Sequence, residues 1–147
     1  MSYKLTCQVE ECTDEELNVY EDATYYENEK GNHECVVFIQ KTTNIPQTKL
    51  WKRGVKVKDT KQGDIAKGTV IATFDEDGSY PTDSLGKHAA IYLRHTNDYI
   101  EVYDQWNAQG KVKKRKIKFD KSITTKRSNN GDTFFVVELV TQKSPIL

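Results

Sequence analysis

The character of the sequence changes at Pro46, and this change limits the folds that the chain can adopt. Before Pro46 two segments carry helix-start signals, whereas after it short runs rich in β-branched and aromatic residues alternate with turn residues. Helices followed by closely spaced consecutive strands are typical of α+β domains. A length of 147 residues is also usual for one domain. We therefore predict a single α+β domain over residues 1–147, with N-terminal helices packed on an antiparallel sheet of about five strands.

A short, mostly exposed first helix is expected within TDEELNVYEDATYY, because Thr13 is a typical N-cap residue and the acids that follow complement the positive end of the helix dipole. This segment belongs to an acidic N-terminal helical region, residues 10–30. The second helix is expected over residues 33–42, after the cap residue Asn32. Its apolar run, residues 36–39, would suit a buried strand equally well, and periodicity does not decide between the two. The N-cap residue favours the helix.

Five strands are expected further along the chain, at residues 68–74, 88–94, 99–106, 116–119 and 133–140. The second and third form a hairpin around the segment HTND, which places His95 in an exposed turn. If the hairpin turns symmetrically, His88 lies opposite Asp104 on one face of the sheet. A shift of one residue would instead bring Gln105 opposite His88.

The charges of the chain balance but are segregated along it. With 22 basic and 22 acidic residues, no overall field draws the chain to nucleic acid or anionic lipid. Glu10 to Glu34 hold ten acids and one lysine, whereas Lys111 to Arg127 hold nine bases and one acid, so we expect these regions to attract each other. The basic run KVKKRKIKF has the alternation of a strand with one solvated face, and no nucleic-acid binding is predicted.

No apolar run approaches the roughly 20 residues that a membrane span needs, so no membrane span is predicted. The N-terminus also lacks the pattern of a cleavable secretion signal. Synthesis in the bacterial cytoplasm without such a signal is therefore expected.

Three cysteines, Cys7, Cys12 and Cys35, leave at least one thiol unpaired. Cys35 falls in the first turn of the second expected helix, where free N–H groups and the helix dipole stabilise a thiolate and lower the pKa of the thiol. This position suits a nucleophile, although a cysteine before an apolar run is also a common small core residue. Acidic residues surround Cys7 and Cys12 and disfavour their thiolates.

His88 opens a predicted strand, where a side chain can face a cleft. A carboxylate beside an imidazole fixes its tautomer and stabilises its protonated form, so Asp104 would make His88 a base for Cys35, with Gln105 as the alternative orienting residue. Taken alone, His88 is also an ordinary strand-end histidine. The histidines and Cys35 lack the spacing of a zinc site, and the turn sequence DEDG lacks the remaining ligands of a calcium loop. We predict no metal and no cofactor.

Several segments taken in order resemble a small bacterial group within the NlpC-type papain-like cysteine hydrolases, relatives of the CHAP amidases: GNHECVVFIQ, PQTKLWKRG, IAKGTVIATF, GSYP, GKHAAIYL and VYDQW. The likeness covers a core of about residues 31–119 and leaves out the acidic N-terminal region and the tail. In that family a cysteine at the start of a buried helix attacks an amide, a histidine on the following sheet is its base, and a polar residue on the next strand orients the histidine. These roles fall on Cys35, His88 and Asp104, although many members carry a histidine at the third position.

The resemblance implies a papain-like fold and acyl transfer through a thioester. The oxyanion would be held by the backbone N–H of Cys35 and a second donor. Asn32 and Tyr26, which precede the helix, are the candidates for that donor. Tyr80, Gln105 and Trp106 are further candidates for the oxyanion site or the walls of the cleft.

The same resemblance implies a substrate and a setting. Family members commonly cut amide bonds in peptidoglycan stem peptides or crosslinks, and several small ones look like antibacterial toxins delivered into rival cells by contact-dependent secretion. A peptidoglycan peptide, a cognate immunity protein and a secretion apparatus are the expected partners, and the periplasm of a target cell is the expected place of action. A papain-like hydrolase or acyltransferase acting on another amide or thioester, and an inert binding or immunity-type module, are the alternatives.

Overall fold

The computed structural model describes residues 13–24, 26–43, 45–81, 86–120 and 126–139. Cys7 and Cys12 lie outside the described residues. The elements include two α-helices, α1 (Asp14–Asn18) and α2 (Cys35–Thr42), and the strands β1 (Trp51–Lys56), β2 (Val70–Thr73), β3 (Ala89–His95), β4 (Tyr99–Asp104), β5 (Lys113–Lys118) and β6 (Phe134–Leu139). The α+β class is confirmed, and the antiparallel sheet has six strands in the order β1-β6-β2-β3-β4-β5.

The first helix begins where the sequence predicts. The Thr13 hydroxyl accepts a hydrogen bond from the Glu16 backbone N–H at 3.1 Å, and the Glu16 carboxylate accepts one from the Thr13 N–H at 3.2 Å. This reciprocal capping box satisfies two donors that the helix itself leaves free. Leu17 then anchors the short helix in the core, where it is fully buried.

The second helix begins at Cys35, two residues later than predicted, and Asn32 does not cap it. The Asn28 carboxamide accepts hydrogen bonds from the backbone N–H groups of Lys30 and Asn32, both at 2.9 Å, and the Asn32 carbonyl accepts the Asn28 N–H. Residues 28–32 therefore close a turn of their own, and Glu34 becomes the N-cap without a side-chain cap bond. Cys35 stays in the first turn of the helix.

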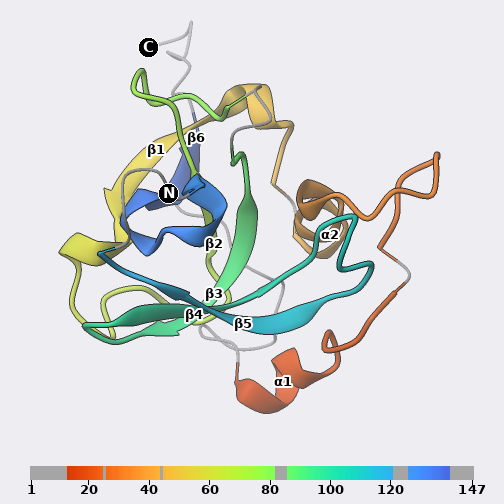
Figure 1. Ribbon diagram of the computed structural model, residues 1–147, viewed down its shortest axis with the longest axis horizontal. Helices are drawn as coiled ribbons and strands as arrows, with labels where there is room; N and C mark the ends of the chain where they lie inside the picture. The colour runs from red at the N-terminus through yellow and green to blue at the C-terminus, as the bar shows by residue number, and fades with distance from the viewer. Residues whose placement is uncertain (1–12, 25, 44, 82–85, 121–125, 140–147) are drawn as a thin grey trace, which may run out of the picture.

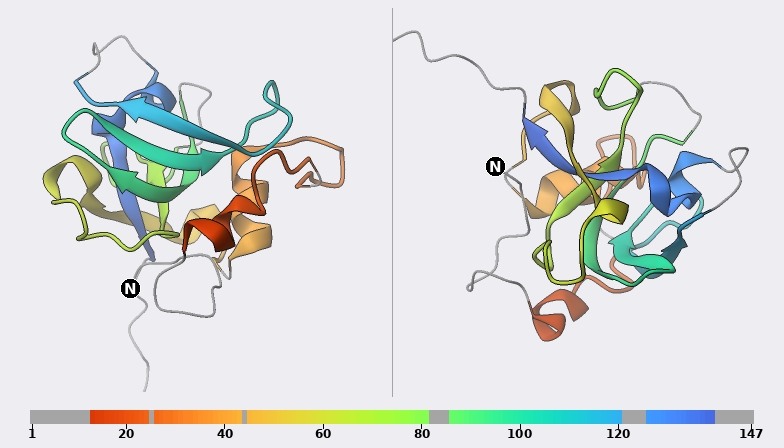
Figure 2. Two further views of the ribbon diagram at one scale, coloured as in Figure 1. Left: turned by 90° about the horizontal axis from the view of Figure 1, so that it is seen from below. Right: turned by 90° about the vertical axis from the view of Figure 1, so that its left-hand side faces the viewer.

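The sheet is strongly curved (Figure 1), and it separates two apolar cores. Both helices pack on the same core, which joins Leu17 of α1 and Phe38 of α2 to residues of β2, β3 and β6, and both lie on one side of the β3–β5 portion in Figure 2. The second core lies on the other face and includes Tyr92, Val102 and Phe134. Successive side chains of a strand alternate between the two faces of the sheet. His88, just before β3, and Asp104, the last residue of β4, therefore lie on the face that carries the second core.

The strand that was not predicted is β1, which pairs with β6 at the edge of the sheet. Its sequence WKRGVK is polar, and only Trp51 is buried, with its indole N–H donating to the Pro46 carbonyl at 2.9 Å. Gly54 is required at this edge, because a Cβ there would lie 2.6 Å from the Val136 carbonyl oxygen. Pairing with a distant strand defines β1, and a local propensity does not reveal it.

The β3–β4 hairpin has a different register from the symmetric one. Tyr92 pairs with Val102 and His95 with Ile100, with an irregularity between Tyr92 and Arg94. His95 is consequently the last residue of β3, and the prediction that it is exposed in the turn is wrong. It is 4% exposed, and its ring contacts the Tyr92 hydroxyl at 2.6 Å.

The segregated charges do meet. Asp22 lies 2.8 Å from the Lys113 ammonium group and 3.6 Å from that of Lys111, so the acidic N-terminal region borders the basic strand. Asp14 likewise pairs with Lys67 at 2.8 Å and with Arg94 at 2.6 Å. These exposed ion pairs help to hold α1 beside the sheet. Over the described part of the chain, none of the helices is long and apolar enough to cross a membrane.

Candidate active site

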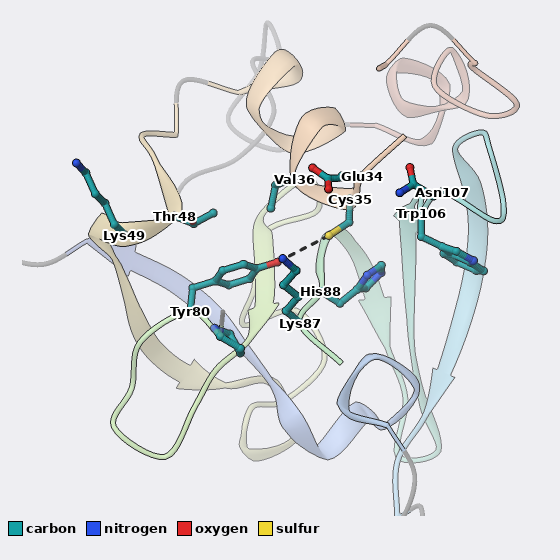
Figure 3. A pocket seen from close by; sticks show the side chains of 11 residues that line it. Glu34, Cys35, Val36, Thr48, Lys49, Tyr80, Lys87, His88, Trp106 and Asn107 are labelled. Carbon is teal, nitrogen blue, oxygen red and sulfur yellow. Dashed lines mark hydrogen bonds between the residues drawn. The ribbon is translucent and has the colours of Figure 1, made fainter. Parts of the chain in front are cut away.

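Cys35 is the first residue of α2 and is partly exposed. Its thiol opens into a pocket of about 430 Å³, called here the cysteine pocket, whose lining includes Glu34, Cys35, Tyr80, Lys87, His88 and Trp106 (Figure 3). At this position the free N–H groups of the first helical turn and the positive end of the dipole face the sulfur. The thiol is therefore both accessible and placed where a negative charge is favoured.

His88 stands beside this thiol and is held from behind by Asp104. Its Nε2 lies 2.7 Å from Asp104 Oδ2, and the two residues are only 4% and 0% exposed. The Thr73 hydroxyl accepts the His88 backbone N–H at 3.0 Å and donates to Gly86, which fixes the imidazole just ahead of β3. Because Asp104 occupies Nε2, Nδ1 is the ring nitrogen that remains free to interact with the Cys35 thiol, whose pKa His88 lowers. The structure thus brings Cys35, His88 and Asp104 together.

Arg115 completes the group and was missed from the sequence. Its Nε and Nη2 donate to Asp104 Oδ2 at 3.0 and 2.7 Å, and its guanidinium lies 5.1 Å from the centroid of the Trp106 ring. The basic run was interpreted as a strand with one solvated face. The overlooked signal is that Arg115 shares the apolar face of that strand with Ile117 and Phe119, where a charged residue needs a partner.

These contacts favour a thiolate facing an imidazolium. Burial raises the pKa of the Cys35 thiol, but His88, the Ala89 backbone N–H and the Tyr80 hydroxyl together outweigh burial and hold this pKa below its ordinary value. Burial lowers the pKa of His88, yet its bonds to Asp104 and Cys35 and their negative charges raise it to about 9. Burial raises the pKa of Asp104, whereas His88 and Arg115 together bring it below the ordinary value.

Tyr80 supplies a hydroxyl on the other side of the thiol. Its oxygen lies 3.8 Å from the Cys35 sulfur, and its ring packs edge-on against Trp51 with centroids 4.9 Å apart. Burial raises the pKa of Tyr80 well above its ordinary value, and the charge of Cys35 raises it further. The hydroxyl therefore stays protonated and can donate to a negative charge at this place, as Figure 3 illustrates.

Gln105 does not orient His88, so this alternative is wrong. Its carboxamide is buried on the opposite side of the strand, where Nε2 donates to the carbonyls of Tyr26 at 2.8 Å and Glu34 at 3.0 Å. Asp104 faces His88 instead, because neighbouring residues of a strand point to opposite faces. Gln105 thereby ties the residue before Cys35 to β4, a positioning contact that the sequence did not reveal.

The two residues proposed as oxyanion donors ahead of the helix are elsewhere. Tyr26 is buried against Phe38, with ring centroids 5.1 Å apart, and Asn32 lines a separate hollow. Neither lines the cysteine pocket. The physical reason is the later start of α2, which leaves Asn32 in the preceding turn. Trp106 does line the pocket, with 36% of its surface exposed and its ring 6.2 Å from that of His88.

A thiol, an imidazole and a buried carboxylate in one open pocket of an α+β domain can activate sulfur for attack on a carbonyl carbon. The chain belongs to the family described as Domesticated amidase effector 2, whose model matches residues 5–137. The match extends on both sides of the core of about residues 31–119 that the sequence resemblance covered, so the acidic N-terminal region and most of β6 are part of the family domain.

Individual relatives agree with this assignment. The chain is 36% identical over 118 residues to the Type VI secretion amidase effector 2 protein of Salmonella typhi, covering 74% of this chain and 86% of the relative. It is 43% identical over 109 residues to Domesticated amidase effector 2 of Ixodes scapularis, covering 72% and 71%. A solved structure of Type 6 secretion amidase effector 2 (Tae2) is similar with a TM-score of 0.72 and 33% identity, over 86% of this chain and 94% of that chain.

Proposed function

We propose that the protein is a cysteine amidase of the NlpC-type papain-like class that hydrolyses an amide bond in the peptide part of bacterial peptidoglycan. The observation that carries the proposal is the Cys35 thiol at the start of α2, in one pocket with a His88 ring whose Nε2 lies 2.7 Å from buried Asp104. The names of the relatives support amide hydrolysis. The resemblance to NlpC-type hydrolases supports peptidoglycan as the source of the amide.

In the acylation step, the Cys35 thiolate attacks the carbonyl carbon of the amide and forms a C–S bond. The backbone N–H of Cys35 and the Tyr80 hydroxyl donate to the oxyanion, so Tyr80 takes the place that was first assigned to Asn32 or Tyr26. His88 then gives its Nδ1 proton to the departing nitrogen as the C–N bond breaks. A thioester and a free amine result.

In the deacylation step, His88 is neutral and accepts a proton from water as the water oxygen attacks the thioester carbonyl. The C–S bond breaks, the acid leaves, and the thiolate–imidazolium pair is restored. Asp104 remains ionised throughout and keeps the Nε2–H tautomer of His88 in place. No metal or cofactor takes part in this scheme.

The setting follows from the same proposal. As a type VI secretion effector with antibacterial action, the protein would reach its substrate in the periplasm of a target cell. A producing cell that holds such an amidase needs protection from it, which calls for a cognate immunity protein that covers the cysteine pocket. The secretion apparatus is the second partner.

The test is digestion of purified peptidoglycan by the wild-type protein, by Cys35→Ala and by the matched control Cys7→Ala, with product masses measured by chromatography and mass spectrometry. The wild type and Cys7→Ala are expected to release the same new peptides, and Cys35→Ala none. Equal products from Cys35→Ala and the wild type would remove Cys35 from the mechanism. An inert binding module would release nothing in all three arms, and alkylation of Cys35 would then leave its function unchanged.

A further inference from the structure

A second pocket of about 440 Å³ adjoins the cysteine pocket on the side of His88. It shares Lys87, His88 and Trp106 with the cysteine pocket and continues to Arg115 and Lys126, but Cys35 does not line it. The exposed Trp106 ring therefore stands at the border between the two. A substrate that extends past His88 enters this second pocket.

The second pocket is positively charged. Its described lining contains Lys87, Arg115 and Lys126 and no acidic side chain. The Arg115 charge is matched by Asp104, but Lys87 and Lys126 are exposed and form no ion pair with an acid in the described ranges. Other lysines do find such partners, among them Lys67 with Asp14. Two lysine charges are thus left for a ligand.

The wall of the second pocket is fixed rather than loose. The Arg115 guanidinium donates to the Ser128 carbonyl and to the Asn129 side chain, both at 3.1 Å, and its face covers Trp106. These contacts tie β5 to the segment that carries Lys126. A ligand between the lysines meets a preformed surface, which lowers the entropy lost on binding.

The proposed reaction indicates which part of the substrate enters the second pocket. The acyl carbon must lie at Cys35, and the departing nitrogen must lie at His88, which protonates it. The part of the substrate that leaves as the amine therefore extends away from Cys35 and past His88. The second pocket lies on that side, with Lys126 in its wall and Lys87 in the wall of both pockets.

We propose that the second pocket is a subsite for a carboxylate carried by the amine part of the substrate, held between Lys87 and Lys126. The proposal rests on the amidase function above and narrows its substrate class to amides whose amine part keeps a free carboxylate. A carboxylate is the anionic group that peptides carry, and an ammonium group binds it as a point charge.

The first test measures binding without catalysis. The Cys35→Ala protein is titrated with two amine products that differ only in a terminal carboxylate or carboxamide, following the tryptophan fluorescence, to which Trp106 at the pocket border contributes. The carboxylate is expected to bind about tenfold more tightly, because two partly exposed ion pairs are worth about this factor, and added salt should reduce the difference. K87Q/K126Q should bring the two dissociation constants together, whereas the matched control K118Q should not.

The second test uses the active protein and two peptide substrates with the same scissile amide and the same pair of amine parts. The ratio of kcat/KM for carboxylate over carboxamide is expected to be about ten in the wild type and close to one in K87Q/K126Q. Each ratio is taken within one variant, so differences in folded fraction cancel.

Equal binding of the two products, or an equal loss of preference in K118Q, overturns the subsite. Such a result leaves the amidase proposal intact as long as Cys35→Ala abolishes digestion. Loss of the amidase proposal is recognised separately, by identical digests from Cys35→Ala and the wild type.

Discussion

Replacing Asp104 with asparagine tests whether the buried carboxylate keeps His88 protonated. Asparagine has nearly the same shape, so the neighbour of His88 Nε2 at 2.7 Å remains while its negative charge is lost. The proposed chemistry needs the Cys35 thiolate and the His88 imidazolium together. Activity should therefore rise with pH as the thiol ionises and fall as pH passes the His88 pKa of about 9.

The size of the effect follows from the His88 pKa. Its rise from 6.5 to about 9 corresponds to about 3 kcal/mol, since one pKa unit is worth about 1.4 kcal/mol. Asp104 and the Cys35 thiolate share this stabilisation against the opposing effect of burial. Without the Asp104 charge, we expect the alkaline limb of kcat/KM to move down by about one to two pH units, with a loss of roughly 2- to 10-fold at pH 8 and roughly 5- to 50-fold at pH 9.

The assay is kcat/KM for a cleavable peptide between pH 5 and 10, measured for the wild type, Asp104→Asn and the control Asp98→Asn, whose residue is exposed in the β3–β4 turn. Asp104→Asn also leaves Arg115 without its counter-charge, so its free energy of unfolding should fall by about 3 kcal/mol. The double variant D104N/R115M separates the two effects. It removes the uncompensated charge of Arg115 but does not restore the negative charge beside His88. An alkaline limb that stays near pH 9 in Asp104→Asn would refute the reasoning, and so would recovered activity in the double variant.

Four further outcomes can be measured. Tyr80→Phe should lower kcat about 10- to 100-fold with little change in KM, because a donor to the oxyanion is lost; an unchanged kcat in steady-state assays would exclude that role. Gln105→Leu should lower the free energy of unfolding in urea by about 2 to 4 kcal/mol, since two buried carbonyls lose their donor. Gly54→Ala should lower it by about 1 to 3 kcal/mol, because its Cβ would lie 2.6 Å from a carbonyl oxygen of β6. The raised His88 pKa stabilises the fold fully below about pH 6.5 and loses this contribution as pH rises toward 9, so the wild type should lose more unfolding free energy between pH 7 and 9.5 than Asp104→Asn, in which part of the rise is absent.

The meeting of Cys35, His88 and Asp104 could be anticipated from the sequence even though the hairpin register was wrong. Tyr92 pairs with Val102, two residues away from the symmetric pairing. A shift of two residues keeps every side chain on its face, because side chains alternate with a period of two. Asp104 still shares a face with His88 and reaches it diagonally, whereas a shift of one would have brought Gln105 there.

The sequence could not predict the contacts between polar groups that lie far apart along the chain. Gln105 donates to the Glu34 carbonyl across 71 positions of the chain, and nothing local distinguishes it from a surface glutamine. Arg115 lies within a run of lysines that was predicted to have an exposed face. That prediction is correct for its neighbours but not for Arg115. Asn32 failed as a cap for a local reason, since Asn28 had already engaged its backbone.

Burying the charged groups around Asp104 lowers the stability of the fold. Oδ2 accepts three N–H donors, one from His88 and two from Arg115, whereas Oδ1 is buried without a hydrogen-bond partner in the described residues. Apolar residues of similar size at positions 88, 104 and 115 would avoid the cost of burying charge, and such replacements often stabilise a core. The arrangement instead maintains a protonated imidazole beside a thiol, and the same guanidinium fixes the wall of the second pocket through Asn129. Chemistry at Cys35 and recognition beyond His88 therefore depend on one ion pair, and a change at Arg115 should disturb both.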